Sequence, residues 1–237
     1  MRDEMDIQKQ ISENLFRADL YRILALGFEE PNPENLRSIQ GIAKDLLELI
    51  CDMECSLELE IALRGLVENG DWNTGVLSAE YYRLFGTHVI CPSSEGSFQQ
   101  VERGPIIGDI SAFYEAFQMK VIEHQGPPDS IKMELGFMSF MALKTVYALE
   151  NGLKEEKEIV DEAQKKFLSS HLGRWVEPFV AKLDESSRYP FYTSLARLLV
   201  KWVTEDCRNI GASPVPLAVH EMKDDGEVSC SLGNLSS

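Results

Sequence analysis

Apolar residues recur at every third or fourth position along most of the chain, which is the spacing of helices that bury one face. Such segments cover residues 6–28, 34–50, 56–70, 78–86, 106–124, the stretch after Asp129, 153–172, 173–183 and 187–210. Only the stretch HVIC, residues 88–91, resembles a strand. The pattern therefore predicts an all-α fold, a single-domain helical bundle of about nine to ten helices over residues 1–210.

Two places depart from this regular helical pattern. Pro127 and Pro128 precede the long apolar stretch after Asp129, so a hinge is possible around residues 126–130. From Gly211 onward the sequence has two prolines and then a run of small or acidic residues. This composition predicts a flexible acidic tail over residues 211–237.

One long irregular segment separates the predicted fourth and fifth helices. It covers residues 86–105, about twenty positions, whereas most connections in compact domains have roughly 4–6 residues. Segments of this length are usually functional or disordered. It contains Ile90, Pro92, Phe98 and Val101, so we expect it to be partly docked on the helices.

Charge and cysteine content narrow the class of partner. The 237 residues are 44% apolar and carry a formal charge of −16, which disfavours nucleic acids and anionic membrane surfaces. The charge suits a basic peptide, although it also serves solubility alone. The start of the chain has no secretory signal pattern, and no window has the roughly 18 apolar residues of a membrane span. Five scattered cysteines do not suggest a disulfide framework, so we expect a cytoplasmic protein without stable membrane insertion.

The common catalytic motifs are absent from the sequence. There is no glycine-rich phosphate loop, no GxSxG elbow and no HExxH pair. His88 and Cys91 are the best metal candidates, but zinc usually takes three or four protein ligands. We therefore predict no catalytic residues, no metal and no cofactor.

Three stretches combine apolar side chains with a carboxylate or a proline at the end of an element. They are EYYRLFG at 80–86, CPSSEGSF at 91–98 and PPDSIKMELGFM at 127–138. Each also has a purely structural interpretation. The aromatic residues of the first can be core, Asp129 or Ser130 can cap the following helix, and Glu134 can be a solvated residue on it. Trp175 and Trp202 are most simply core residues.

Together with FLSSHLGRWVEPF at 167–179 and PFYTSLARLL at 190–199, these stretches resemble a known family. The pattern is similar to the TorD/DmsD/NarJ-like cytoplasmic chaperones, the redox enzyme maturation proteins of molybdenum oxidoreductases. The resemblance covers roughly residues 10–205. It implies an all-helical protein that is not an enzyme. Such a protein binds the twin-arginine signal peptide of a catalytic subunit of the DMSO reductase family, assists cofactor insertion and delays export.

The resemblance also implies where the peptide binds. The family's Pro-Asp-His hinge corresponds to Pro128, Asp129 and Ser130, and the serine cannot carry the positive charge that a histidine can. The predicted peptide-binding residues are Tyr82, Leu84, Phe85, Pro92, Glu95, Phe98, Pro128, Asp129, Ser130, Glu134 and Met138. A receptor for two arginines and an apolar helix needs carboxylates beside an apolar groove, and methionines suit such a groove.

Other functions remain compatible with the sequence alone. The chain can be an all-α adaptor that binds folded redox-enzyme subunits without recognising a signal peptide. A GTP-binding or hydrolysing protein is a further alternative, although no phosphate loop supports it. The expected partners are a twin-arginine signal peptide and the apo catalytic subunit of a molybdopterin oxidoreductase. The chain itself is expected to be a monomer or a domain-swapped dimer.

Overall fold

The computed structural model describes residues 2–50, 56–68, 72–86, 88–99, 102–120 and 126–217. These ranges contain nine α-helices, one short 3₁₀ helix and no strand, which confirms the all-α prediction. The elements are α1 (Arg2–Gly27), α2 (Pro33–Leu49), α3 (Leu57–Glu68), α4 (Thr74–Phe85), η2 (Glu95–Ser97), α5 (Arg103–Ala116), α6 (Ile131–Glu150), α7 (Lys154–Ser170), α8 (Leu172–Ser186) and α9 (Pro190–Ile210). None of these helices is long and apolar enough to cross a membrane.

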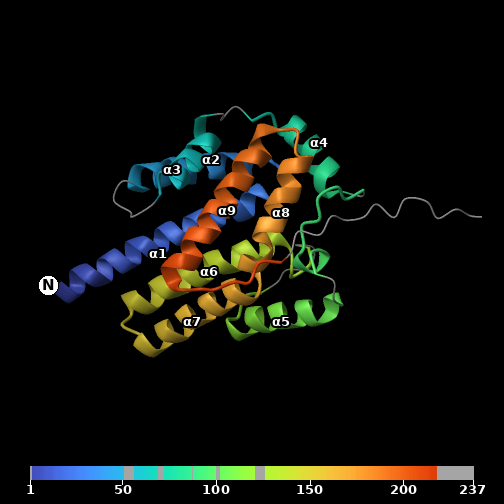
Figure 1. Cartoon of the computed structure of the whole chain (residues 1–237). Helices are drawn as coiled ribbons and strands as arrows, with labels where there is room; N and C mark the ends of the chain where they lie inside the picture. The colour runs from blue at the N-terminus through green and yellow to red at the C-terminus, as the bar shows by residue number, and fades with distance from the viewer. Residues whose placement is uncertain are drawn as a thin grey trace, which may run out of the picture.

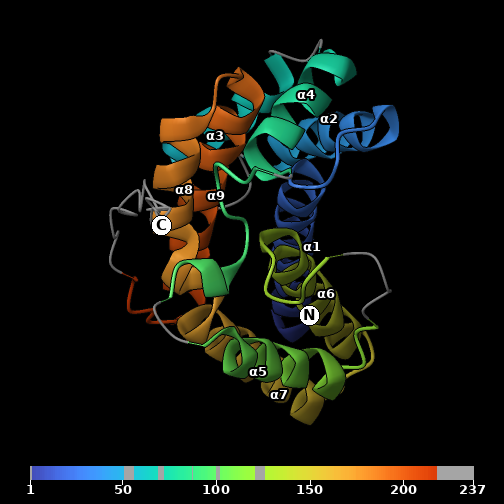
Figure 2. The same ribbon diagram turned by 90° about the vertical axis from the view of Figure 1, so that its right-hand side faces the viewer.

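Helices α1 and α6 pack along each other and form the centre of the bundle. The Ser139 hydroxyl in α6 donates a hydrogen bond of 2.8 Å to the backbone oxygen of Ala18 in α1. Figures 1 and 2 show α2, α3 and α4 at one end of the molecule and α5 and α7 at the other. Helices α8 and α9 run between these ends, so the long central helices connect two differently built regions.

The core is rich in aromatic side chains. Trp175 and Trp202 are both buried, as predicted from the sequence. The Trp202 ring lies 5.6 Å from the Tyr21 ring and 6.3 Å from the Phe16 ring, both in edge contacts. Such edge contacts add to the stabilisation from burying apolar area. Buried apolar residues of α1, α8 and α9 therefore belong to one continuous hydrophobic core.

Several helix ends agree with local sequence signals. The Asn32 side chain accepts hydrogen bonds from two backbone amides at the start of α2, where Pro33 is the first helical residue. Gly211 ends α9 in the left-handed conformation, with φ 71°. The fifth helix is shorter than the sequence predicted. It ends at Ala116, because Gln118 adopts a positive φ of 59°, and residues 121–125 lie outside the described residues.

The segment after α9 continues along the protein surface. The Leu217 amide donates to the backbone oxygen of Arg174 at 2.8 Å, and the Ser213 amide donates to the Ser169 hydroxyl at 3.1 Å. These bonds attach residues 211–217 to the junction of α7 and α8. The rest of the predicted tail, residues 218–237, lies outside the described residues.

Candidate functional site

The long irregular segment is docked on the start of α6. The Glu95 amide donates to the Asp129 backbone oxygen at 2.8 Å, and the Ile131 amide donates to the Ser93 oxygen at 2.9 Å. An isolated antiparallel bridge pairs Ser94 with Ser130. The prediction of a partly docked segment is therefore confirmed for residues 88–99. The strand-like interpretation of residues 88–91 is wrong, because this stretch turns back to bond with the Leu84 oxygen at the end of α4.

Asp129 is the centre of this docking. Its carboxylate is fully buried and accepts two hydrogen bonds from the guanidinium of Arg103, at 2.9 Å from Nε and 2.7 Å from Nη2. The Gly96 amide donates to the same carboxylate at 3.1 Å. The capping interpretation of Asp129 is wrong, since its acceptors are already used by these groups. Ser130 takes the N-cap position of α6, but its hydroxyl makes no capping bond.

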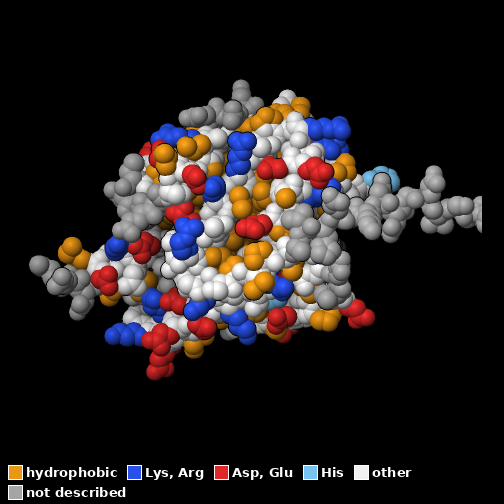
Figure 3. All heavy atoms as spheres, in the orientation of Figure 1, with side chains coloured by type: hydrophobic (Ala, Val, Ile, Leu, Met, Phe, Trp, Pro, Cys, Tyr) orange, Lys and Arg blue, Asp and Glu red, His pale blue; other side chains and the backbone are white. Residues whose placement is uncertain are grey.

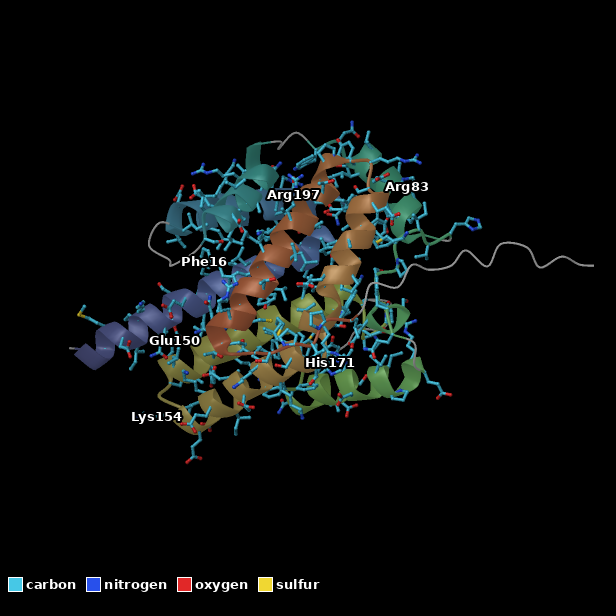
Figure 4. All side chains as sticks on the ribbon, in the orientation of Figure 1. Phe16, Arg83, Glu150, Lys154, His171 and Arg197 are labelled. Atoms are coloured by element: carbon cyan, nitrogen blue, oxygen red, sulfur yellow. The ribbon has the colours of Figure 1, made fainter. Side chains whose placement is uncertain are left out.

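A second carboxylate, Glu95, is buried beside a histidine. Its Oε2 atom lies 3.0 Å from Nδ1 of His171, and its Oε1 atom accepts from the Gln99 amide at 2.5 Å. The other ring nitrogen of His171 lies 3.1 Å from Oδ2 of Asp109 on α5. Figure 4 labels His171, which lies where α7 passes into α8. One imidazole thus connects the docked segment to α5.

Glu134 is the third carboxylate of the site and is fully buried in α6. Its Oε2 atom accepts a 3.0 Å hydrogen bond from the Trp175 indole, while Oε1 has no partner. Burial raises the pKa of Glu134 well above its ordinary value of 4.5, and repulsion from Glu95 adds to this rise. The interpretation of Glu134 as a solvated residue is therefore wrong, and a neutral carboxyl group is the form that suits this environment.

The apolar members of the predicted site divide between surface and core. Leu84, Met138 and Met141 are fully buried and Met133 is nearly so, so these methionines pack the core and do not line an open groove. The expectation that these methionines line a peptide groove is therefore wrong, because their face of α6 packs against the protein core. The side chain of Tyr82 is 54% exposed, and its hydroxyl lies 2.5 Å from Oε1 of Glu30. The half-buried members are Phe85, Pro92, Phe98 and Pro128.

Ring contacts join these aromatic side chains into one strip. The Phe98 ring lies 5.6 Å from Trp175 and 6.3 Å from Phe179. The strip continues from Phe179 through Phe28 to Phe85, with centroid distances of 5.3 Å and 6.4 Å. Tyr81 and Tyr82 extend it at the end of α4. The structure thus brings the three sequence stretches together around α8.

Sequence reasoning did not assign Arg103, Asp109 or His171 to this site. It placed Trp175 in the core, but it did not foresee that its indole bonds to Glu134. His171 and Trp175 lie within FLSSHLGRWVEPF, one of the stretches that carried the family resemblance, which was the available signal. Arg103 is a basic residue at the end of the long segment in a strongly acidic chain. Such an isolated cation is a natural partner for a buried carboxylate, although its position in sequence does not reveal which one.

A metal at His88 and Cys91 does not fit the structure. His88 is exposed and Cys91 is buried, and burial raises the pKa of the Cys91 thiol to about 12. Within the described ranges, no three His, Cys, Asp or Glu side chains are arranged to hold a metal ion. The thiol of Cys207 is also buried and free, with a pKa raised to about 12. Both thiols are therefore poor nucleophiles near neutral pH.

Of the three buried carboxylates, Glu95 lines a cavity of about 480 Å³ that also adjoins His171. Its lining includes Glu95, Gln99, Asp109, His171 and Arg174. Arg103 is also accessible, since 44% of its side chain is exposed although its partner Asp129 is buried. The site can therefore recognise cations or hydrogen-bond donors.

Comparisons with known proteins agree with this architecture. The chain is 26% identical over 218 residues to the "Chaperone protein TorD" of Shewanella loihica, which covers 86% of this chain and 97% of the relative. It is also 26% identical over 219 residues to the "Perchlorate reductase assembly chaperone protein" of Dechloromonas aromatica, with 86% and 93% covered. Both relatives are named chaperones and not enzymes, as the sequence indicated for this chain.

Structure and sequence-family comparisons point the same way. A crystal structure described as a redox enzyme maturation protein from Archaeoglobus fulgidus superposes with a TM-score of 0.51 at 18% identity, covering 79% of this chain and 93% of that one. This likeness supports the fold. A sequence model of the nitrate reductase delta subunit family matches residues 52–181, more than half of the chain. The chain therefore belongs to the nitrate reductase delta subunit family, the TorD/NarJ-like group of redox-enzyme chaperones.

Proposed function

We propose that this chain is a cytoplasmic maturation chaperone that binds the twin-arginine N-terminal segment of a molybdoenzyme catalytic subunit. By holding that segment, the chaperone keeps the apo-subunit from export until its cofactor has been inserted. Family membership supports the chaperone role, and a relative is named for the assembly of perchlorate reductase. The identity of the bound segment is our inference from the chemistry of the site.

The observation that supports the proposal most directly is the paired hydrogen bond between the Arg103 guanidinium and the Asp129 carboxylate, called the fork below. Two hydrogen bonds of 2.7 Å and 2.9 Å hold the guanidinium on the buried carboxylate. Paired bonds of this kind favour arginine over lysine, because only the planar guanidinium presents two parallel donors. Within the chain itself, Asp129 thus binds an arginine side chain in this paired geometry at the predicted peptide site.

We infer that an arginine of the client takes the place of Arg103 on Asp129. Arg103 is 44% exposed and stands at the first position of α5, so its guanidinium can move into solvent, which leaves the buried Asp129 carboxylate in need of a new partner. The incoming guanidinium then restores the pairing that Asp129 requires, since an unpaired buried carboxylate is costly. Glu95 lies in the same docked segment and is a second carboxylate for the neighbouring arginine.

The apolar predicted residues contact the rest of the client near its arginines. Tyr82, Phe85, Pro92 and Phe98 are half-buried or exposed, and the aromatic strip described above connects Tyr82, Phe85 and Phe98. The backbone of Pro128 is fixed by the Tyr114 hydroxyl, which donates to its oxygen at 2.8 Å. We therefore assign these residues to the client's side chains that flank the arginine pair, and the 126–130 segment to the hinge of the site.

Calorimetric titration with synthetic peptides tests this function. One peptide carries the Arg-Arg pair and the apolar run of a molybdoenzyme signal, and its matched control replaces the pair with Lys-Lys. The proposal predicts micromolar or tighter binding of the Arg-Arg peptide and about ten-fold or greater weakening with Lys-Lys. Equal affinities for both peptides would overturn arginine recognition. Equally tight binding of the client with and without its signal would favour the adaptor alternative.

A further inference from the structure

A second cavity lies on the seam between α5 and α7 and has a different chemistry from the carboxylate site. Its volume is about 550 Å³, and its floor is formed by Phe113, Phe117, Ile159 and Ala163. Its rim consists of three glutamates and one lysine of α7, namely Glu155, Glu158, Glu162 and Lys166. An open apolar floor with an acidic rim suits a segment that is both apolar and cationic.

The rim glutamates are available to a partner. All three are exposed, and among the described residues none of them forms an ion pair or a side-chain hydrogen bond. Their spacing of three and four residues places them on one face of α7, beside Ile159. The side chain of Ile159 is 62% exposed, which leaves apolar area that a partner can bury. This face therefore combines unpaired charge with uncovered hydrophobic surface.

The same seam leads from this groove to the carboxylate site. The cavity beside His171 is lined by Pro105, Ile106 and Asp109 from the first half of α5. The apolar groove is lined by Phe113 from the second half of that helix and by Phe117, the residue that follows its end. Figure 2 shows α5 and α7 adjacent at this end of the molecule, and Phe113 contacts Phe167 at 5.3 Å. The two cavities therefore follow each other along α5.

We propose that the α5–α7 groove binds the apolar run that follows the client's arginine pair. This inference rests on the proposed function, because it assumes that an arginine is held at Asp129, beside Arg103 at the start of α5. From Arg103 to Phe113 and Phe117 the chain advances ten to fourteen residues, roughly 15–21 Å at the helical rise. A helical client segment of about 10–14 residues spans the same distance.

Charge selects this occupant over a second copy of the chain. The net charge of −16 makes self-association over an acidic rim unfavourable, whereas a client segment that carries two arginines beside its apolar run is attracted to the chain. Figure 3 shows acidic and basic side chains mixed along the lower edge of one face, where α7 lies. The selectivity therefore comes from the groove itself and not from a uniformly acidic surface.

A matched pair of isoleucines provides the test. Ile159 and Ile61 are 62% and 59% exposed, and Ile61 lies on α3 at the opposite end of the molecule. Ile159→Asp is expected to weaken binding of the full Arg-Arg peptide about ten-fold or more, because an aspartate cannot contribute apolar burial to the groove. Ile61→Asp is expected to leave the affinity within about two-fold of wild type. Circular dichroism melts verify that both variants fold.

A shortened peptide separates this inference from the proposed function. It keeps the Arg-Arg pair but replaces the apolar run with glycine and serine, and its binding is expected to be weaker and insensitive to Ile159→Asp. If Ile159→Asp binds the full peptide as well as Ile61→Asp does, the groove assignment is overturned while arginine recognition stands. If wild-type protein binds Arg-Arg and Lys-Lys peptides equally, both the proposed function and this inference are overturned.

Discussion

The carboxylates beside the docked segment and those along α7 have the same charge and opposite surroundings. Asp129, Glu95 and Glu134 are buried, and each accepts a hydrogen bond from another side chain. Glu158 and Glu162 are exposed on a helix face beside an open apolar floor. The buried carboxylates bond to side chains around the start of α6. Among the described residues, Glu158 and Glu162 form no ion pair or side-chain hydrogen bond.

Because of this difference, we expect the buried carboxylates to select arginine and the exposed glutamates to attract a cationic peptide. A buried, pre-arranged carboxylate distinguishes an arginine from a lysine by geometry, and the Arg103 fork is an example. Exposed glutamates are screened by salt and act mainly on the rate of encounter with a cationic segment. A receptor with both kinds can attract a basic peptide along α7 and identify its arginines near α6. The predictions below change one region while leaving the other intact.

The largest expected change in the free energy of unfolding is that caused by Trp175→Ala. This substitution removes a fully buried ring that contacts Phe98 and Phe179 and also removes the donor to Glu134. The free energy of unfolding should fall by about 3–5 kcal/mol, the range for buried aromatic truncation. Urea denaturation measures it. A loss below about 1.5 kcal/mol would mean that this ring does not organise the site.

Asp129→Asn should come next in size and should affect both folding and binding. The amide cannot accept the guanidinium fork, so the free energy of unfolding should fall by about 1.5–3 kcal/mol, the range for bonds to charged groups. Affinity for the Arg-Arg peptide should also fall at least ten-fold. The matched control Glu162→Gln removes an exposed charge and should change unfolding by less than about 0.5 kcal/mol. Equal effects of the two variants would contradict the distinction between the regions.

Glu134→Gln should have a smaller effect that depends on pH. The pKa of Glu134 is raised in the folded state, so the folded protein keeps this proton while the unfolded chain releases it above about its ordinary 4.5. Wild-type stability contributed by this group is therefore full below that pH and is lost as pH rises toward the folded pKa. Glutamine mimics the protonated form. The free energy of unfolding of the variant should therefore increase relative to that of wild type as pH rises from 4 to 8. A constant difference across this range would contradict a neutral Glu134.

The helices were predictable because each leaves a local signature. Apolar spacing located all nine helices of the described residues, Pro33 marked the first residue of α2, and Gly211 followed α9. The end of α5 was not predictable in this way, since the positive φ of Gln118 is imposed by the surrounding fold and not by a glycine. Docking of residues 88–99 was predictable from their apolar content, but the partners at Asp129 and Ser93 were not.

The roles of the site residues depended on which face of a helix turned inward. The stretch IKMELGFM has apolar residues on every side, so its pattern did not show that Glu134 is buried. Ion-pair partners were equally hidden, because Arg103 lies 26 residues before Asp129 and Glu95 lies 76 residues before His171. The α5–α7 groove requires two helices at a particular separation, which no single stretch of sequence contains.

The most direct test of arginine exchange at Asp129 is a titration of Arg103→Ala with the Arg-Arg and Lys-Lys peptides. If a client arginine replaces Arg103, the variant lacks the internal competitor and should bind the Arg-Arg peptide several-fold more tightly than wild type. The Lys-Lys peptide, which cannot form the fork, should gain little. Unchanged or weaker binding of the Arg-Arg peptide by folded Arg103→Ala would show that Arg103 is only a structural partner of Asp129, and would contradict the exchange.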